Sequence, residues 1–187
     1  MTHRDEIIAA ATRLTESDGW STITMSRLAD EVGVSRQTVY NEVGSKPELA
    51  QAMVLTELAT FLAVVDAAFD AHPEDAVAAV RLAVRGVLEM AERHTLLSAI
   101  VAAGHGANTD LLPLLTTRSD SVLTLAKAAI GDRLAPMAQH VGRRHTETVV
   151  DVVVRTVLSH VMQPGRPPRA TADDLAWAVD RLLAEAG

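Results

Sequence analysis

Apolar residues recur every three to four positions along most of this chain, and polar residues fill the positions between them. This spacing is typical of amphipathic helices. After Pro47 the chain has neither a two-residue alternation nor a hairpin dipeptide between apolar runs, so we expect no strands there. The pattern predicts an all-α fold of about nine helices.

Prolines, glycines and polar clusters divide the chain after residue 47 into separate helices. We expect Gly131-Asp132 to end one helix, Gly142 to end the next, and residues 163–170 to form a proline-rich connector. Pro113 predicts a kinked turn or a short helix around residues 111–115. The expected helices cover approximately residues 46–70, 73–93, 95–103, 119–130, 133–141, 147–162, and 171 onward.

Residues 24–46 have the pattern of a helix-turn-helix. Thr24 and Ser35 are placed to cap its two helices, since their side-chain oxygens can accept hydrogen bonds from N-terminal backbone N–H groups. Gly33 lies at the turn, where glycine adopts a positive φ without steric cost. The first turn of the second helix is polar and can reach base edges or phosphates in a DNA groove. The pattern favours DNA binding over the simpler interpretation, an ordinary helical hairpin inside a bundle.

The same spacings extend over residues 4–53, and together they resemble the DNA-binding domain of the tetracycline-repressor (TetR) family. The matching positions are Arg4, Ile7, Ile8, Ala10, Ala11, Leu14, Gly19, Trp20, Thr22, Ile23, Thr24, Leu28, Ala29, Gly33, Val34, Ser35, Thr38, Val39, Tyr40, Ser45 and Lys46. The resemblance implies a helix-turn-helix DNA-binding domain in residues 1–47 and a ligand-binding and dimerisation domain in residues 48–187. It also implies a homodimer that represses from a palindromic operator on double-stranded DNA, until a small molecule releases it.

We expect Arg36 and Gln37 to read base edges, and Thr24, Ser35, Thr38, Tyr40 and Lys46 to hold phosphates, with Asn41 completing the DNA-binding set. Two positions depart from the family pattern. Val43 stands where the family often has an aromatic residue, and Glu42 where it often has His or Tyr near a phosphate. These departures concern contacts at the end of the recognition helix, not the motif itself.

The charge of the chain does not favour nucleic acid on its own. The net charge is −7, and residues 1–47 hold five Lys or Arg against seven Asp or Glu. Residues 33–46 have a net charge of +1, from Arg36 and Lys46 against Glu42. So few cations predict a modest dependence of DNA affinity on salt. Helix N-termini at Thr24, Ser35 and Ser45 can add attraction for phosphates through their backbone N–H groups.

The second domain is rich in Ala, Val and Leu and has few aromatic residues. Such a lining predicts a small lipophilic effector, although each apolar position is also explained as plain core. The predicted ligand-binding residues are Val84, Leu88, His94, Leu96, Ile100, His105, Leu112, Leu115, Leu123, Val150 and Val154. His94 and His105 flank the short helix that lies near the pocket mouth in the family and are candidates to anchor the ligand; the alternative is that they are structural or solvent-exposed histidines.

Residues 147–162 are apolar on more than one face, which predicts a helix buried on both sides. With the last helix it would form a four-helix interface across a two-fold axis. The alternative is that residues 147–162 form the central helix of a monomer core. The predicted interface residues are Val153, Val157, Leu158, Val161, Leu175, Val179 and Leu182.

Several classes of protein are excluded or disfavoured. The chain has no cysteine, no catalytic or phosphate-binding motif, and no pair of histidines four residues apart, so we expect no enzyme activity, cofactor or metal. The N-terminus does not resemble a signal peptide, and the longest uncharged stretch, residues 95–109, is too short to span a bilayer. We therefore expect a cytoplasmic, nucleoid-associated protein without membrane partners. The second interpretation is a helical protein–protein adaptor with a degenerate DNA-binding module.

Overall fold

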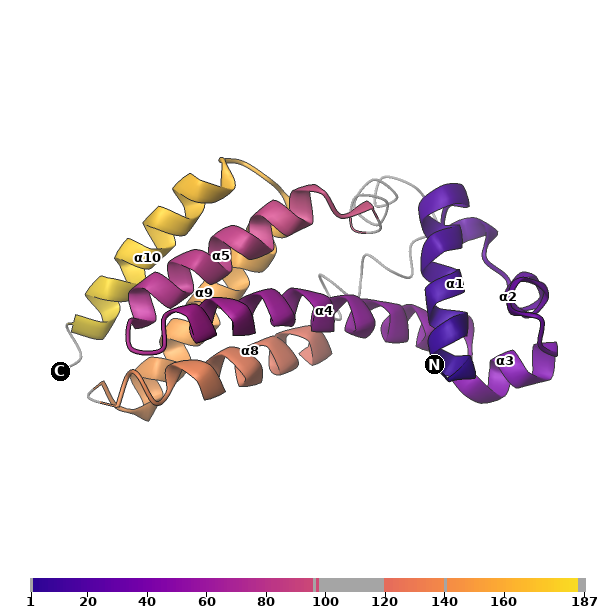
Figure 1. Cartoon of the computed structure of the whole chain (residues 1–187), viewed down its shortest axis with the longest axis horizontal. Coiled ribbons are helices and arrows are strands. Elements are labelled where there is room, and N and C mark those ends of the chain that lie inside the picture. Colours follow the sequence, from indigo (N-terminus) through magenta and orange to yellow (C-terminus); the bar gives the residue numbers. More distant parts are fainter. Residues whose placement is uncertain (1, 96, 98–119, 140, 185–187) are drawn as a thin grey trace. The chain divides into compact units, whose positions relative to one another are not determined.

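The computed structural model describes residues 2–95, 97, 120–139 and 141–184 (Figure 1). Every regular element within these ranges is helical, so the predicted all-α class is confirmed. The elements are α1 (His3–Asp18), the 3₁₀ helix η1 (Trp20–Thr22), α2 (Met25–Val32), α3 (Arg36–Val43), α4 (Lys46–Ala71), α5 (Ala76–Glu92), α8 (Asp120–Leu134), α9 (Arg143–Met162) and α10 (Pro168–Ala184).

The chain forms two compact units. The first consists of Met1–Glu57 and His94–Ser119, and the second of Leu58–Arg93 and Asp120–Gly187. Helix α4 contributes its N-terminal part to the first unit and the remainder to the second. The expected domain boundary after residue 47 stays a prediction.

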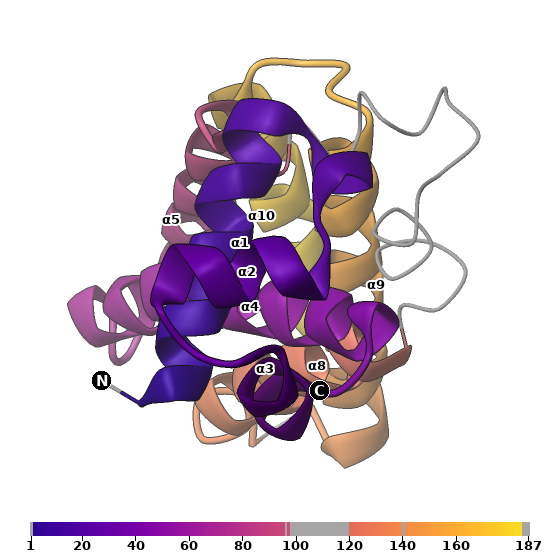
Figure 2. The same ribbon diagram turned by 90° about the vertical axis from the view of Figure 1, so that its right-hand side faces the viewer.

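The first unit contains the predicted helix-turn-helix. Helices α1, α2 and α3 pack against one another (Figure 2) around side chains that are fully buried, including Ile7, Leu28 and Val39. Both predicted caps are present: the side-chain oxygen of Thr24 accepts a hydrogen bond from the Arg27 N–H at 3.1 Å, and that of Ser35 from the Thr38 N–H at 3.0 Å. Gly33 turns the chain between α2 and α3 with a φ of 75°, a conformation that costs glycine little.

The second unit is a helical bundle with an aliphatic core. Helix α10 packs along α5, and α8 along α9. The core consists almost entirely of Ala, Val and Leu, with Phe69 from α4 as its one buried aromatic side chain among the described residues. Gly86 lets α5 approach α4 closely, since a Cβ atom at this position would lie only 2.7 Å from Val64 Cγ1.

Several predicted helix boundaries in the second unit are wrong. Gly131-Asp132 does not end α8, which continues to Leu134. A glycine within a helix costs only about 1 kcal/mol, and burial of Leu134, which is 1 % exposed, favours the longer helix. A separate helix over residues 133–141 is not formed: after Leu134 the described residues form turns.

Helices α9 and α10 both begin earlier than expected, at Arg143 rather than Glu147 and at Pro168 rather than Thr171. Proline is tolerated in the first turn because its missing N–H would have no helical partner there. Thr171 is therefore not a cap. It lies within α10, is buried, and donates its backbone N–H to the Pro167 carbonyl oxygen at 3.2 Å. The helices predicted over residues 95–103 and 111–115 fall largely outside the described residues.

Candidate nucleic-acid interface

Helix α3 has one buried and one exposed face. Val39 and Val43 are 0 % and 3 % exposed and pack into the first unit, whereas Arg36, Gln37 and Asn41 are exposed. Val43, the first departure from the family pattern, therefore belongs to the core of the module. Six of the predicted DNA-binding residues lie on α3 or at its cap: Ser35, Arg36, Gln37, Thr38, Tyr40 and Asn41.

The exposed face of α3 has two pairs of side chains at i, i+4 spacing. Arg36 Nη2 donates to the Tyr40 hydroxyl at 3.2 Å, and its guanidinium lies 5.4 Å from the centre of the Tyr40 ring. Gln37 Nε2 donates to Asn41 Oδ1 at 2.9 Å. Pairs at this spacing restrict the rotamers of long side chains. The polar groups of α3 are therefore partly ordered without DNA.

The other two predicted DNA-binding residues lie on neighbouring elements. Thr24 is exposed and caps α2. Lys46, at the start of α4, is only partly exposed: Nζ donates to the carbonyl oxygens of Trp20 at 3.0 Å and Ile23 at 2.7 Å, and lies 4.7 Å from the centre of the Trp20 ring. These contacts tie α4 to the turn that precedes α2, a structural role that sequence reasoning did not find.

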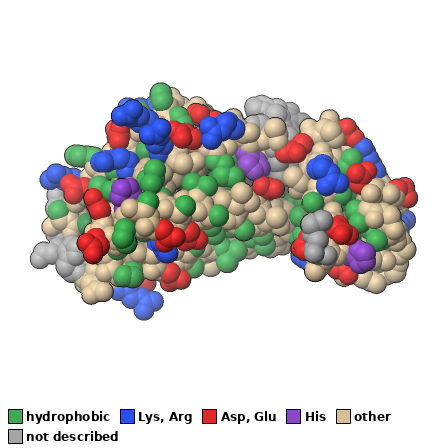
Figure 3. Space-filling model, viewed as in Figure 1, with side chains coloured by type: hydrophobic (Ala, Val, Ile, Leu, Met, Phe, Trp, Pro, Cys, Tyr) green, Lys and Arg blue, Asp and Glu red, His purple; other side chains and the backbone are tan. Residues whose placement is uncertain are grey.

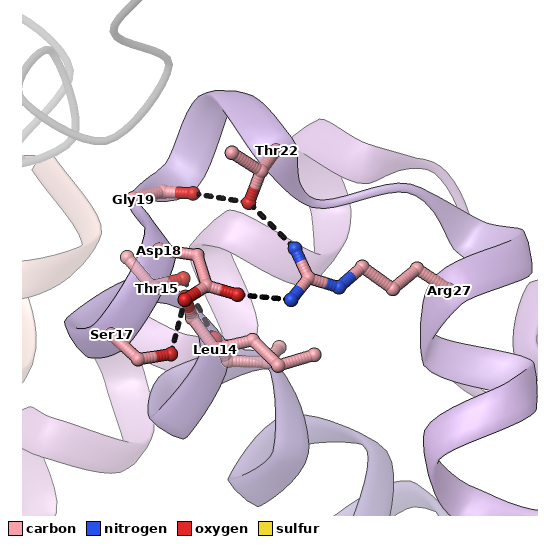
Figure 4. Close-up of polar contacts among 8 residues, drawn as sticks. Leu14, Thr15, Ser17, Asp18, Gly19, Thr22 and Arg27 are labelled. Carbon is pink, nitrogen blue, oxygen red and sulfur yellow. Dashed lines mark hydrogen bonds and ion pairs between the residues drawn. The ribbon is translucent and has the colours of Figure 1, made fainter.

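A polar network also connects the end of α1 to α2 (Figure 4). Arg27 of α2 donates to the Asp18 carboxylate and, at 2.9 Å, to the Thr22 hydroxyl, which in turn donates to the Gly19 carbonyl oxygen at 2.9 Å. Hydrogen bonds from Arg27 and then Ser17 lower the pKa of Asp18. The network fixes the turn between α1 and α2, from which the helix-turn-helix begins.

The C-terminal end of α3 and the turn that follows it are held by one long-range contact and by local contacts. Arg4, in the first turn of α1, donates to the backbone carbonyl oxygen of Glu42 in the last turn of α3. After α3, the Glu48 carboxylate accepts from both the backbone N–H and the hydroxyl of Ser45, each at 2.7 Å, which lowers the pKa of Glu48. These contacts satisfy orphan groups at the helix ends.

The five cationic side chains of residues 2–57 all have intramolecular partners. Arg13 and Arg27 pair with carboxylates, those of Glu31 and Asp18. Arg4 and Arg36 contact neutral oxygens and so keep an uncompensated charge. On the face shown in Figure 3, cationic and acidic side chains are intermixed. The electrostatic attraction for a phosphate backbone is therefore small.

The predicted ligand-binding residues fall into three groups. Five lie together in the core of the second unit: Val84, Leu88, Leu123, Val150 and Val154. Leu96, Ile100, His105, Leu112 and Leu115 lie outside the described residues. His94 belongs to the first unit, where Nε2 lies 2.9 Å from a Glu57 carboxylate oxygen and Nδ1 accepts from the Leu97 N–H at 3.4 Å.

The predicted dimer residues are mostly shielded within their own unit. Val153, Leu175 and Val179 are buried, and Val157, Leu158 and Val161 pack against the same core. Leu182 is 41 % exposed. Sequence reasoning missed two exposed apolar side chains on the same two helices, Val152 at 43 % on α9 and Trp177 at 65 % on α10. A periodicity that marks most of α9 as apolar could not separate its inner from its outer positions.

A metal site and a membrane-spanning helix both receive little support from the described residues. No group of three or more potential metal ligands occurs among the residues that the structure describes. Helix α4 is long and apolar enough to cross a membrane by length and composition alone. However, Leu49 and Met53 in its first part are fully buried and Phe69 near its end is 2 % exposed, as in the core helix of a folded module.

Comparison with known proteins identifies both parts of the chain. Residues 7–53 match the family model for bacterial regulatory proteins of the tetR family, and residues 75–181 match the model for the bacterial tetracyclin repressor C-terminal domain. The chain belongs to the TetR family. It is a DNA-binding transcription regulator and not an enzyme, as its sequence predicted.

Individual TetR-family relatives resemble the chain over nearly its full length. The HTH-type transcriptional regulator AlkX of Mycobacterium tuberculosis (strain ATCC 25618 / H37Rv) is 33% identical over 177 residues, covering 92% of this chain and 81% of the relative. The crystal structure of the TetR-family repressor AlkX from Dietzia sp. strain DQ12-45-1b, implicated in biodegradation of n-alkanes, has a TM-score of 0.80 with 26% identity, covering 99% and 97% of the two chains.

A third relative shares the fold at lower identity. The TetR-family repressor FadR of Thermus thermophilus, solved in complex with lauroyl-CoA, has a TM-score of 0.63 at 22% identity and covers 98% of this chain and 94% of its own. At this identity the likeness extends to the fold alone.

Proposed function

We propose that the chain represses transcription as a homodimer, by placing helix α3 of each subunit in the major groove of a palindromic operator. The observation that carries this proposal is the exposed face of α3, where Arg36–Tyr40 and Gln37–Asn41 form two ordered pairs. Arg36 and Gln37 contact base edges, and Ser35, Thr38 and Tyr40 contact phosphates. Thr24, at the start of α2, and Lys46, at the start of α4, also contact phosphates.

The second part of the proposal is a homodimer formed through α9 and α10. Val152 and Trp177 give these helices exposed apolar side chains that burial against a second copy would remove from water. Leu182 of α10 is a further exposed apolar side chain, at 41 %. A two-fold dimer brings two copies of α3 to one duplex, and this arrangement requires half-sites about one helical turn apart, on the order of 34–36 Å.

The third part is release by an effector with a long alkyl chain. The core of the second unit around Val84, Leu88 and Val150 is aliphatic and offers such a chain apolar contact without aromatic stacking. The n-alkane association of the Dietzia repressor and the lauroyl-CoA bound to the Thermus repressor are consistent with this chemistry. A thousandfold loss of DNA affinity requires about 4 kcal/mol of differential ligand binding between the two states.

The residues that follow α5 could transmit ligand binding to the DNA-binding helices, and so release the protein from DNA. His94 pairs with Glu57 of α4, and Thr95 donates to the Glu16 carboxylate of α1. Both contacts lie within the first unit, so a ligand that moves this segment would act on α1 and α4 directly. Glu57→Gln and Glu16→Gln are expected to alter ligand release while leaving DNA affinity without ligand nearly unchanged.

Selection from a random pool of DNA duplexes tests the proposal. The full-length protein is expected to enrich an inverted repeat, and a sedimentation experiment is expected to show two copies of the chain on each selected duplex. Saturated acyl and alkyl compounds of increasing length are then added, and longer chains are expected to release the duplex more effectively. An adaptor with a degenerate module would enrich no sequence at any salt concentration, and this outcome would refute the proposal.

A further inference from the structure

The hydrogen bond between Gln37 and Asn41 restricts how α3 can read a base. Both side chains are exposed on the face opposite the buried Val39 and Val43. Gln37 donates one N–H of its amide to Asn41 Oδ1 at 2.9 Å. A glutamine amide has two N–H donors and one carbonyl acceptor, and no other hydrogen bond of the Gln37 amide occurs among the described residues. One N–H and the carbonyl oxygen Oε1 therefore remain for DNA.

We propose that Gln37 reads an adenine in the major groove and that Asn41 is its positioning residue. This inference rests on the proposed function. Adenine presents the N7 acceptor beside the N6 donor, which matches the remaining N–H and Oε1 of Gln37. Guanine presents two acceptors, N7 and O6, and thymine presents O4 beside a methyl group. Neither base can satisfy both Gln37 groups.

Asn41 supports this choice because, while its Oδ1 faces Gln37, the Gln37 amide cannot turn over alone; a reversal requires both amides to turn over together. Rotation of the amide by half a turn would replace the Nε2–H···Oδ1 hydrogen bond by two carbonyl oxygens facing each other. Without Asn41 the amide can adopt either orientation, and in the reversed one Nε2 can donate to guanine O6 or thymine O4. The Asn41 carbonyl oxygen therefore affects which base Gln37 selects, and it contributes little to the affinity for DNA.

The test uses the duplex selected by the wild-type protein, with each of the four base pairs placed in turn at every position of a half-site. Gln37→Ala first identifies the position that this residue reads, as the one where the base preference disappears. At that position wild-type protein is expected to prefer adenine by about ten- to a hundredfold. Asn41→Ala is expected to reduce this ratio to within a few-fold, with the preferences at other positions unchanged.

Asn41→Asp provides the matched control. Its carboxylate is an acceptor only, so it holds the Gln37 amide in the same orientation and the adenine preference is expected to persist. The added negative charge weakens binding to all duplexes alike. The quantity to compare is therefore the ratio of the affinities for adenine and for the other bases at this position, not the affinity itself. Thermal melting checks that each variant remains folded.

Three outcomes would overturn the inference. Gln37→Ala could abolish a preference for a base other than adenine, or Asn41→Ala could leave the adenine ratio unchanged. Asn41→Ala could also remove the preference at a different position, which would make Asn41 a reader of its own base. If the wild-type protein enriches no sequence at all, the proposed function fails, and this inference fails with it.

Discussion

Arg4 in the first turn of α1 donates a hydrogen bond to the backbone carbonyl oxygen of Glu42 in the last turn of α3. The last carbonyls of a helix have no partner within the helix, and the C-terminal end of its dipole is negative. An arginine at this point therefore stabilises the end of the recognition helix. It also gives Arg4 a role that does not require contact with DNA.

We predict that Arg4→Ala makes the last turn of α3 fray and weakens operator binding several-fold. The expected loss of folding stability is small, about 0.5–1 kcal/mol, because the side chain is exposed. Hydrogen exchange of the α3 amides measures the fraying, and fluorescence anisotropy measures binding. Arg13→Ala is the matched control, since Arg13 lies on the same helix but pairs with Glu31 of α2 at 3.5 Å. Unchanged protection of α3 in Arg4→Ala would contradict this role.

The two lysines of the chain provide a second comparison. Lys46→Met leaves the Trp20 and Ile23 carbonyl oxygens without their donor and removes the ammonium from the Trp20 ring. We expect a loss of about 1–3 kcal/mol in the free energy of unfolding. Lys127→Met removes a partly exposed ion pair with Asp151 and is expected to cost less than about 1 kcal/mol. Urea denaturation measures both, and equal losses would show that Lys46 is an ordinary surface lysine.

The position of Lys46 illustrates what the sequence could and could not predict. Thr24 and Ser35 cap their helices through hydrogen bonds to N–H groups three residues away, so local sequence was sufficient. The carbonyl partners of Lys46 lie 26 and 23 residues away in the chain. Such contacts depend on how the helices pack. Sequence reasoning therefore placed Lys46 at the start of a helix, but it could not predict that two carbonyl oxygens hold its ammonium.

The same limit explains the errors in helix boundaries. Local propensity predicts a helix end at Gly131, yet the burial of Leu134 outweighs that propensity. Val153 and Val179 match an interface pattern, but both are buried in the core of their own unit. A pattern of apolar positions predicts burial and does not distinguish burial by the same chain from burial by a second copy.

Two glycines within helices are predicted to respond in opposite directions to alanine. At Gly86 a new Cβ atom would meet Val64 Cγ1 at 2.7 Å, so either the Val64 side chain or helix α5 must shift. We expect Gly86→Ala to destabilise the protein by about 1–3 kcal/mol. At Gly131 a Cβ atom meets nothing within 4 Å, and alanine is expected to stabilise by about 0.5–1 kcal/mol. Thermal unfolding of the two variants checks this prediction, and a shift of both melting temperatures in the same direction would refute it.

Acid should destabilise the helix-turn-helix partly through Asp18. Its pKa is lowered in the folded state, chiefly by the hydrogen bond from Arg27. The stability from this contact is therefore present above the unfolded pKa of about 3.9 and is lost as the pH falls through the folded value. Asp18→Asn and Arg27→Gln should both flatten the dependence of the unfolding free energy on pH below about pH 5. Urea denaturation at a series of pH values measures this slope, and a slope as steep as that of the wild type in both variants would contradict the account.

The DNA affinity of this protein should depend on salt more weakly than is usual for a helix-turn-helix protein. If one or two cations per subunit contact phosphates in a dimer, the slope of log affinity against log salt is expected to be about −2 to −4. Arg36→Ala should make this slope shallower, since Arg36 is exposed and keeps its charge. Fluorescence anisotropy at several salt concentrations gives the slope. A value near −8 would require phosphate contacts from about four or five cations in each subunit and would contradict this prediction.

The most direct test of the account is the affinity of wild type, Arg36→Ala and Arg143→Ala for the selected duplex and for a scrambled duplex of equal length. Arg143 is an exposed arginine of α9 in the second unit and serves as the matched control. We predict that Arg36→Ala binds the selected duplex at least tenfold more weakly than wild type and loses most of the discrimination against the scrambled one, whereas Arg143→Ala retains both. Equal binding of the selected duplex by all three proteins would show that α3 does not read DNA.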